Sequence, residues 1–424
     1  MPRRPLVSLL LALAVLALAP APARAGEPDA IAPAYDVSLQ GFDRGLRWTG
    51  RETIAFTNPG AAPLDRIWVR LWGNGVLGCH RTPHVRIANA AGATPGEPSA
   101  ACSAVPLRLA VPLAPGARGS VSFDVDIRVP RRSDRFGRER HLALLSNAIP
   151  ALAHLEGGAW RLDPYVGFGE AWTYPAADWT VRLDAPPGIA VAAPGVRQAD
   201  GSRHLADGRD YSFAAGRLRS IRATVAGVQV TVWGVAGKPL AKVMRIARRR
   251  LPRLSALFGP YGWPDLQIVL VDDVAMEHTG LIMTPALDYV VTHELAHEWW
   301  YALIGGDQAQ APWLDEAFAS FAEEAAGAQR VPWCRRSGPL TRLVTRDVAY
   351  FDHHHENYGA IYSEGACLLD ILRKRMGPDR FADALRGYAL ANRYGWSTAA
   401  RFRAAMDAAS PVALGDLWRR YRVQ

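Results

Sequence analysis

The chain has 424 residues, of which 49% are hydrophobic and 21% are charged. This composition excludes an intrinsically disordered protein and leaves enough apolar residues for two or three packed domains. The formal net charge of +9 comes from 49 basic and 40 acidic residues, and the basic residues are scattered except for Arg248–Arg250. A short basic run on a helix is typical of a solvated face, so we expect no nucleic-acid partner.

The first 25 residues have the pattern of a secretory signal peptide. Arg3 and Arg4 form a basic start, Leu6–Leu18 is an apolar run, and Ala23–Ala25 fits a small-residue cleavage site. The alternative is a membrane anchor, but the apolar run is too short to span a bilayer. We therefore expect an exported protein, periplasmic or secreted, without a membrane span after cleavage. Because residues 1–25 hold three basic and no acidic residues, cleavage lowers the formal charge from +9 to +6.

Residues 26–234 are predicted to form an all-β domain of the saddle or sandwich type. Short segments rich in β-branched and aromatic residues are separated by turn signals such as Asn58-Pro59-Gly60. We expect strands at residues 52–58, 67–72, 120–127, 179–183 and 228–233.

The pattern becomes helical near residue 237, and residues 235–424 are predicted to form a second, mostly helical domain with a small sheet. We expect a helix at residues 240–257 and a buried strand at residues 266–271. Two glycines at 305–306 should end the next helix, and Pro312 should open the one after it. These later helices are predicted at residues 287–304, 313–326, 360–376, 380–391, 398–408 and 414–422.

Four cysteines are present, namely Cys79, Cys102, Cys334 and Cys367. Export permits disulfides, and each predicted domain holds two of the cysteines. None has the spacing of a zinc-binding pair. Of the three possible connectivities, the simplest is Cys79–Cys102 with Cys334–Cys367.

His293-Glu294-Leu295-Ala296-His297 matches the H-E-x-x-H pattern of zinc metallopeptidases and lies in a predicted helix. A spacing of four places both imidazoles on one helix face, one turn apart, so that they can approach one ion together. Glu294 lies about 100° further round the helix and can face the attacking water. The same pattern also occurs as a salt-bridged helix face, so a third metal ligand is needed to support the interpretation.

Glu316, nineteen positions after His297, is the candidate for that third ligand. Catalytic zinc takes three protein ligands and keeps one open position. The glycines that end the first helix let the chain turn back, so the helix that carries Glu316 can pack beside it. The first helix is otherwise apolar, and unpaired buried charge there would be costly. We predict one Zn²⁺ bound by His293, His297 and Glu316, with Glu294 as the general base.

This arrangement, with Glu316 inside Trp-Leu-Asp-Glu, resembles the gluzincin aminopeptidases of the aminopeptidase N family. Residues 258–264 resemble the segment that leads into the family's catalytic strand. Residues 275–278, Ala-Met-Glu-His, resemble its exopeptidase motif, and residues 361–365 resemble its tyrosine motif. The resemblance implies an α+β architecture, in which an all-β N-terminal domain precedes a thermolysin-like, mostly helical zinc metallopeptidase domain. It also implies that the metal site lies where the two domains meet.

The resemblance further implies roles for residues outside the zinc motif. Glu277 would bind the free α-amine of a peptide, and Glu170 would reach the site from the first domain. Tyr362 would stabilise the oxyanion of the reaction, as one hydrogen-bond donor aimed at a developing charge. Tyr358 is a nearby competitor for this role.

Three positions depart from the family pattern: Val274 stands for Gly, His278 for Asn and Glu364 for Lys. They leave the zinc ligands unchanged but bear on substrate specificity. Glu323 lies seven residues after the third ligand, and is either a partner of a metal ligand or a solvated residue. His353–His355 has the look of a metal tract, but adjacent residues cannot share one helix face, which favours an exposed loop.

The sequence therefore predicts a zinc-dependent aminopeptidase that hydrolyses the N-terminal peptide bond of a peptide substrate. One alternative is a zinc endopeptidase or another hydrolase on the same scaffold. Another is a non-enzymatic peptide-binding relative, whose mark would be a lost ligand or base. The sequence carries no signal for an oligomeric state.

Overall fold

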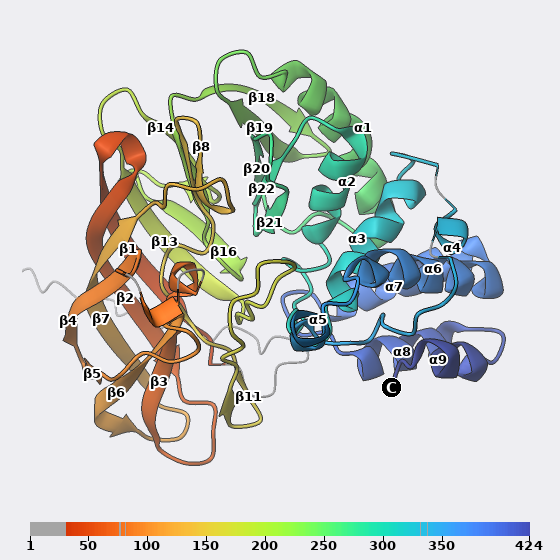
Figure 1. Cartoon of the computed structure of the whole chain (residues 1–424), viewed down its shortest axis with the longest axis horizontal. Coiled ribbons are helices and arrows are strands. Elements are labelled where there is room, and N and C mark those ends of the chain that lie inside the picture. Colours follow the sequence, from red (N-terminus) through yellow and green to blue (C-terminus); the bar gives the residue numbers. More distant parts are fainter. Residues whose placement is uncertain (1–30, 76–77, 81, 331, 337) are drawn as a thin grey trace, which may run out of the picture.

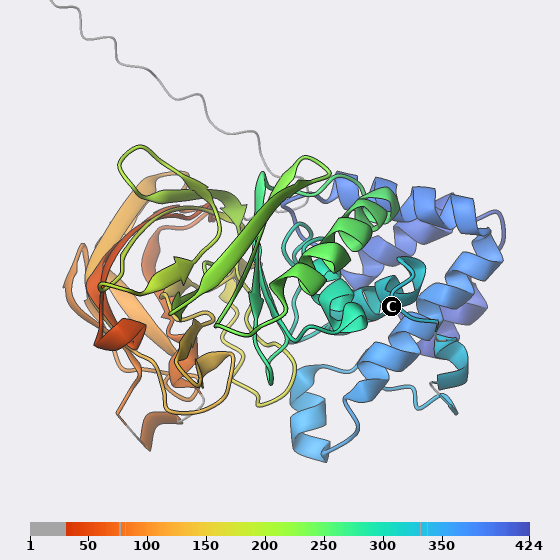
Figure 2. The ribbon, with the colours of Figure 1, turned by 90° about the horizontal axis from the view of Figure 1, so that it is seen from above.

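The computed structural model describes residues 31–75, 78–80, 82–330, 332–336 and 338–424, so the predicted signal peptide lies outside the described residues. A β-rich first part is followed by a second part, in which helices pack against a five-stranded sheet (Figure 1). The two parts lie side by side in the view from above (Figure 2). The predicted order of an all-β part before a mostly helical part is confirmed.

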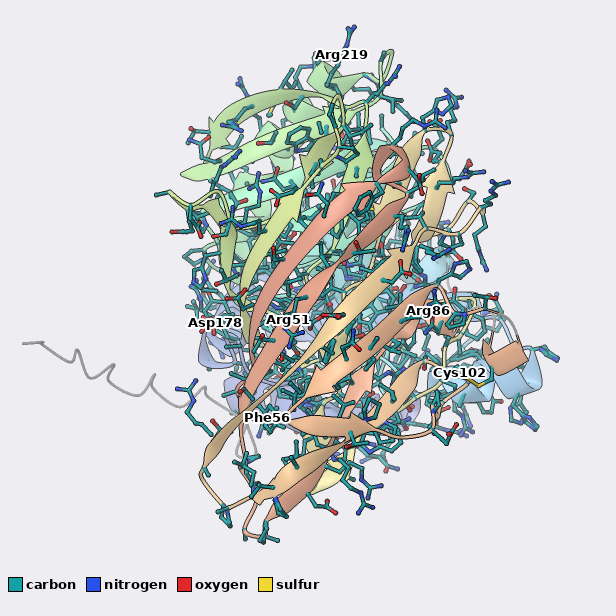
Figure 3. All side chains as sticks on the ribbon, turned by 90° about the vertical axis from the view of Figure 1, so that its left-hand side faces the viewer. Arg51, Phe56, Arg86, Cys102, Asp178 and Arg219 are labelled. Carbon is teal, nitrogen blue, oxygen red and sulfur yellow. A yellow bond between two sulfur atoms is a disulfide. The ribbon has the colours of Figure 1, made fainter. Side chains whose placement is uncertain are left out.

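The largest sheet of the first part has seven strands, in the order β15-β16-β13-β1-β2-β7-β4. Burial alternates along its central strands, as in a sheet with one face on a core and one face in water. Arg51 and Arg86 stand on the outer face (Figure 3), where Arg51 pairs with Asp124 and Arg86 with Asp126. Its strands are β1 (Ala34–Phe42), β2 (Arg47–Thr57), β4 (Val85–Ala91), β7 (Arg118–Arg128), β13 (Ala177–Asp184), β15 (Val196–Arg197) and β16 (Arg203–Gly208).

Two four-stranded sheets, in the orders β10-β3-β6-β5 and β14-β17-β9-β8, and one hairpin, β11-β12, complete the first part. Between β12 and β13, residues 161–176 have no regular secondary structure, and we call this segment the strap. The remaining elements are β3 (Leu64–Arg70), β5 (Ala93–Pro95), β6 (Ala104–Leu113), β8 (Phe136–Glu139), β9 (Leu142–Leu145), β10 (Ala151–Leu152), β11 (Leu155–Glu156), β12 (Ala159–Trp160), β14 (Ala190–Ala192), β17 (Phe213–Gly216) and the 3₁₀ turns η1 (Asp43–Gly45), η2 (Trp72–Asn74) and η3 (Gly78–His80).

The five-stranded sheet of the second part has the order β18-β19-β20-β22-β21. By sheet membership this part begins at β18, before residue 234, because β19 pairs in parallel with β20. The division into two domains at residue 234 stays a prediction. Neither β21 nor β22 was predicted from the sequence, because both are short and wholly buried and show no alternation. The strands are β18 (Arg219–Val225), β19 (Val228–Gly234), β20 (Asp265–Leu270), β21 (Met276–His278) and β22 (Leu281–Thr284).

Most of the helices lie within two residues of their predicted bounds, whereas α4 and α5 were not predicted. The first helix buries apolar residues at a spacing of three and four and ends at Phe258, before Gly259, whose φ of +99° favours glycine. Among the described residues, none of the helices combines the length and the apolarity that crossing a bilayer requires. They are α1 (Leu240–Phe258), α2 (Asp288–His297), α3 (Trp313–Ala325), α4 (Trp333–Arg336), α5 (Val348–His354), α6 (Gly359–Met376), α7 (Pro378–Ala391), α8 (Ala399–Ala409) and α9 (Gly415–Tyr421).

The helix predicted at residues 287–304 was wrong in its length, because α2 ends at His297. Beyond it, the N–H groups of residues 302, 303 and 304 donate to carbonyls five residues earlier, so the chain widens out of the α-helix. The buried guanidinium of Arg209 fixes this turn by donating to the carbonyl of Tyr301, with an Nε–O distance of 2.8 Å. A Cβ at Gly305 would lie 2.2 Å from that guanidinium, so a glycine is required there. This contact comes from the first part and has no local sequence signal.

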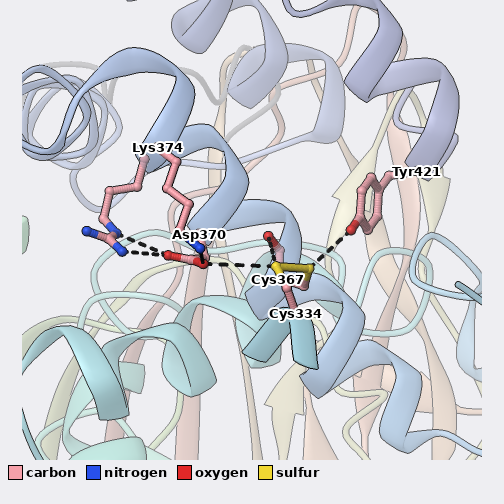
Figure 4. The surroundings of a disulfide bond; sticks show 6 residues. Cys334, Cys367, Asp370, Lys374 and Tyr421 are labelled. Atoms are coloured by element: carbon pink, nitrogen blue, oxygen red, sulfur yellow. Dashed lines mark hydrogen bonds and ion pairs between the residues drawn. A yellow bond between two sulfur atoms is a disulfide. The ribbon is translucent and has the colours of Figure 1, made fainter. Parts of the chain in front are cut away.

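Both predicted disulfides are confirmed. Cys79–Cys102 lies in the first part, and Cys334–Cys367 joins α4 to α6. Figure 4 shows the second bond beside Asp370 of α6 and the hydroxyl of Tyr421 in α9. Because α6 also carries Tyr362, the bond secures the helix that reaches the predicted site.

Candidate metal centre and active site

Two histidines of α2 and one glutamate of α3 converge on a single point. The Nε2 atoms of His293 and His297 lie 3.1 Å and 3.5 Å from Oε2 of Glu316. An ion bound tetrahedrally at about 2.0–2.1 Å separates its ligand atoms by about 3.3–3.4 Å. The distances therefore fit one ion of the size of Zn²⁺, and the structure brings together the three ligands predicted from the sequence.

The electrostatics of this point also fit a cation. Burial lowers the pKa of His293, but its hydrogen bonds to Glu316 and Glu323 outweigh this effect and raise the pKa to about 10. Burial opposes ionisation of Glu316, yet hydrogen bonds to both histidines hold its pKa well below the ordinary value. Negative charge is thus concentrated between the rings, where a divalent ion would take the place of a proton.

Buried carboxylates orient both histidines from behind. Nδ1 of His293 lies 2.9 Å from Oε1 of Glu323. Nδ1 of His297 makes a short hydrogen bond to Oδ1 of Asp315 and lies 3.2 Å from the carbonyl oxygen of Trp300. Such partners fix the ring tautomer and leave Nε2 free for a metal. Of the two interpretations of Glu323, the structure favours the partner of a ligand, whereas sequence reasoning missed Asp315.

Glu294 lies beside the three ligands and is 4% exposed. One of its carboxylate oxygens falls within 4.8 Å of a ring nitrogen of His297 and of a carboxylate oxygen of Glu277. Burial raises the pKa of Glu294 to about 7, close to the range in which a general base works well. This placement suits the predicted role of Glu294 as the base, which remains a prediction.

Glu277 lies on β21, at the edge of the five-stranded sheet, and a buried hydrogen-bond chain connects it to the metal centre. Gln308 Nε2 donates to Oε1 of Glu277 over 3.2 Å and makes a short hydrogen bond to Oδ2 of Asp315. Asp315 in turn holds His297. The predicted amine anchor and one predicted metal ligand are therefore positioned together. Sequence reasoning missed Gln308, which lies in an irregular loop without a motif.

Glu170 reaches the same cluster from the strap, so the first part of the chain contributes a carboxylate to the site. Its Oε1 accepts a hydrogen bond from Nη1 of Arg135 over 3.1 Å. Burial raises the pKa of Glu170 well above its ordinary value, and the charge of Glu316 raises it further. This influence of Glu316 indicates that Glu170 lies near the metal centre, and its role in substrate binding stays a prediction from the resemblance.

Of the two tyrosines that competed for one role, Tyr362 contacts a proposed metal ligand. Its hydroxyl donates to Oε1 of Glu316 over 2.7 Å, and its ring stacks on His293 with centroids 5.9 Å apart. Burial raises the pKa of Tyr362 well above its ordinary value, so the phenol keeps its proton and remains a donor. The hydroxyl of Tyr358 is buried without a hydrogen-bond partner among the described residues.

The residues that depart from the family pattern take part in packing around the site. The ring of His278 is buried, with Nδ1 2.7 Å from Asp210 and Nε2 2.8 Å from Ser146. These contacts tie β21 to the first part directly behind Glu277. The carboxylate of Glu364 accepts a short hydrogen bond from the backbone of Thr341. The tract at 353–355 is exposed at the end of α5, so it takes no part in the metal centre.

Residues 246–421, which include β21, α2, α3 and α6, match the Peptidase family M1 domain. The chain carries a peptidase domain of family M1. It is 25% identical over 250 residues to aminopeptidase N of Lactobacillus delbrueckii subsp. lactis, covering 49% of this chain and 30% of that protein. It is 27% identical over 215 residues to aminopeptidase M1-B of Oryza sativa subsp. japonica, covering 42% of this chain and 24% of that protein. The chain thus spans less than a third of the length of these curated relatives.

Solved structures extend the likeness in fold beyond residues 246–421 to most of the chain. The crystal structure of the M1 zinc metallopeptidase from Deinococcus radiodurans aligns with a TM-score of 0.67 and 22% identity, covering 94% of both chains. A mutant of that enzyme bound to Tyr-Ser-Ala substrate aligns with a TM-score of 0.64 and the same identity and coverage. At this identity the likeness establishes the arrangement of the two parts, and the roles of single residues rest on the contacts described above.

Proposed function

We propose that this chain is a zinc-dependent aminopeptidase that removes the N-terminal residue of peptides. The observation that carries the proposal is a cluster in which a three-ligand metal set lies beside three buried carboxylates, those of Glu294, Glu277 and Glu170. The M1 domain and the aminopeptidase names of its relatives support it. The structural neighbour that binds Tyr-Ser-Ala supports a peptide as the substrate class.

Each residue of the cluster has a distinct part in this reaction. Zinc held by His293, His297 and Glu316 would supply Lewis-acid catalysis, polarising the scissile carbonyl and lowering the pKa of water. Glu294 takes the proton of the attacking water and passes it to the leaving amine. The hydroxyl of Tyr362 donates a hydrogen bond to the developing oxyanion.

The two carboxylates beside the metal centre explain why an aminopeptidase is favoured over an endopeptidase. Glu277 and Glu170 come from different parts of the chain, β21 and the strap, and are both buried. A free α-ammonium group placed between them supplies the positive charge that buried carboxylates require. Because their position relative to the metal ligands is fixed, they select the peptide bond that lies one residue from the N-terminus.

Export to the periplasm or the extracellular medium is part of the proposal. The signal-peptide pattern of residues 1–25 supports it. Two disulfides among the described residues support it independently, because such bonds persist in oxidising compartments.

The decisive experiment compares amino-acid arylamides with their N-acetylated counterparts, before and after removal of the metal with a chelator. We expect hydrolysis of the free amines alone, loss of activity with the chelator and recovery with Zn²⁺. Equal cleavage of the acetylated substrates would instead identify an endopeptidase or another hydrolase. Binding of peptides without turnover would identify a non-enzymatic relative.

Glu294→Gln tests the proposed base. The substitution leaves the three metal ligands in place but removes the proton acceptor, so we expect wild-type zinc content and a kcat lower by about 10²–10⁴-fold. Metal analysis and steady-state kinetics measure both quantities, with Glu356→Gln, at an exposed position, as the matched control. Undiminished turnover in Glu294→Gln would show that another group is the base.

A further inference from the structure

One arginine of the first part, Arg135, lies against the strap close to the proposed active site. It directly precedes β8 and is 7% exposed. No sequence motif singled it out, and it lies outside the residues that match the M1 domain. A buried guanidinium is costly unless its charge and its donors are satisfied, so its partners indicate what it does.

The partners of Arg135 are concentrated on four neighbouring strap residues. Nη1 donates to Oε1 of Glu170 over 3.1 Å and to the carbonyl oxygen of Gly169 over 2.9 Å. The guanidinium also lies over the rings of Trp172 and Tyr165, at 5.2 Å and 5.7 Å from their centroids. The adjacent Asp134 is a weaker partner, with Oδ1 3.9 Å from Nε. One side chain therefore holds a segment that has no strand or helix of its own.

The held segment also forms one wall of the site. Phe168 packs against Tyr358, with ring centroids 5.1 Å apart, and a Cβ at Gly169 would meet the Tyr358 hydroxyl at 2.5 Å. The carboxylate of Glu170 interacts electrostatically with Glu277 and with the metal ligand Glu316. The strap thus depends on Arg135 at the point where Glu170 enters the site.

We propose that Arg135 is a positioning residue, which fixes the strap so that Glu170 meets the α-ammonium group of the substrate opposite Glu277. This inference rests on the proposed aminopeptidase function and adds a residue on which its substrate binding depends. Arg135 acts through Glu170 and does not touch the metal ligands. Its removal therefore weakens substrate binding and leaves the bound metal and the chemical step in place.

A double-mutant cycle on the full zinc-loaded chain tests this assignment. KM and kcat for an amino-acid arylamide are measured for wild type, Arg135→Met, Glu170→Ala and the double variant. We expect each single variant to raise KM by about 10–100-fold, the effect of losing one charge-assisted hydrogen bond, with kcat changed by less than about threefold. Because the two residues act as a unit, the double variant should have the KM of Glu170→Ala alone.

Two further variants guard against a purely structural effect. Arg138→Met is the matched control, because Arg138 lies on β8 and has no hydrogen bond or ion pair to the strap among the described residues. Its KM should equal that of wild type. Arg135→Lys keeps the charge but not the forked contact with Glu170 and Gly169, so its KM should be intermediate. It also gives a measurement if Arg135→Met does not fold.

The outcomes separate this proposal from the aminopeptidase proposal. Three results would overturn the positioning role alone. The KM of Arg135→Met could equal that of Arg138→Met, or the KM increases of the two single variants could multiply in the double variant. The third result is loss of zinc from Arg135→Met. A wild type that neither cleaves arylamides nor binds L-leucinamide by calorimetry would overturn both proposals.

Discussion

Replacing Asp315 tests how the metal centre is assembled, because this residue orients a ligand without being one. Its two carboxylate oxygens accept short hydrogen bonds from Nδ1 of His297 and Nε2 of Gln308. In Asp315→Ala both hydrogen bonds are lost at a buried position. The imidazole of His297 is then free to change its tautomer or to rotate, so that Nε2 no longer points at Glu316 for most of the time.

We expect Asp315→Ala to bind zinc about 10–100-fold more weakly than wild type, which corresponds to about 1.4–2.7 kcal/mol. The contacts of His297 keep the loss of zinc affinity in Asp315→Ala within this range of about 10–100-fold. The carbonyl oxygen of Trp300, 3.2 Å from Nδ1 of His297, remains as a second acceptor and limits the loss. Asp315→Asn keeps an oxygen acceptor but loses the charge, so its zinc affinity should lie between those of wild type and Asp315→Ala.

The assay is a competition titration of zinc against a chromophoric chelator, with thermal unfolding as a check on folding. Asp352→Ala is the matched control, because Asp352 is exposed on α5. It should bind zinc as the wild type does. An affinity of Asp315→Ala within about twofold of wild type would refute the argument that this carboxylate positions the ligand.

Three further predictions concern the chemistry and the stability of the second part. Tyr362→Phe should lower kcat by about 10²–10³-fold through loss of one oxyanion donor while zinc content stays unchanged, and an effect on KM alone would contradict this role. Burial raises the pKa of Glu294 to about 7, and a divalent cation beside it would lower it. Because the base is active only when ionised, kcat/KM of the zinc enzyme should fall as the pH drops through a value below about 7. A pH profile in which kcat/KM already falls above about pH 7 would count against Glu294 as the base. Replacing Cys334 and Cys367 with serine opens a loop of 33 residues and should reduce the free energy of unfolding by about 2–4 kcal/mol, which an unchanged denaturation midpoint would contradict.

The sequence failed where long-range contacts overrode a local pattern. The helix predicted to run to residue 304 ends at His297, and Arg209, ninety-two positions before Tyr301, holds the turn that follows by donating to the Tyr301 carbonyl. The strands β21 and β22 lacked any alternation, because both of their faces are buried. The helices that carry the metal ligands were predicted because their apolar spacing and their terminal residues are local features.

The residues of the active site also divide into those with a local sequence signal and those that depend on long-range contacts. The sequence by itself determined His293, Glu294 and His297, because a spacing of four on a helix fixes their mutual geometry, and it pointed to Glu316, Glu277 and Tyr362 through motifs. Only the tertiary structure revealed the carboxylate of Asp315 behind His297, the amide of Gln308 between two carboxylates, and the guanidinium of Arg135 on the strap. The physical reason is that these contacts join segments whose approach depends on how the sheet, the helices and the strap pack, and no local pattern encodes that packing.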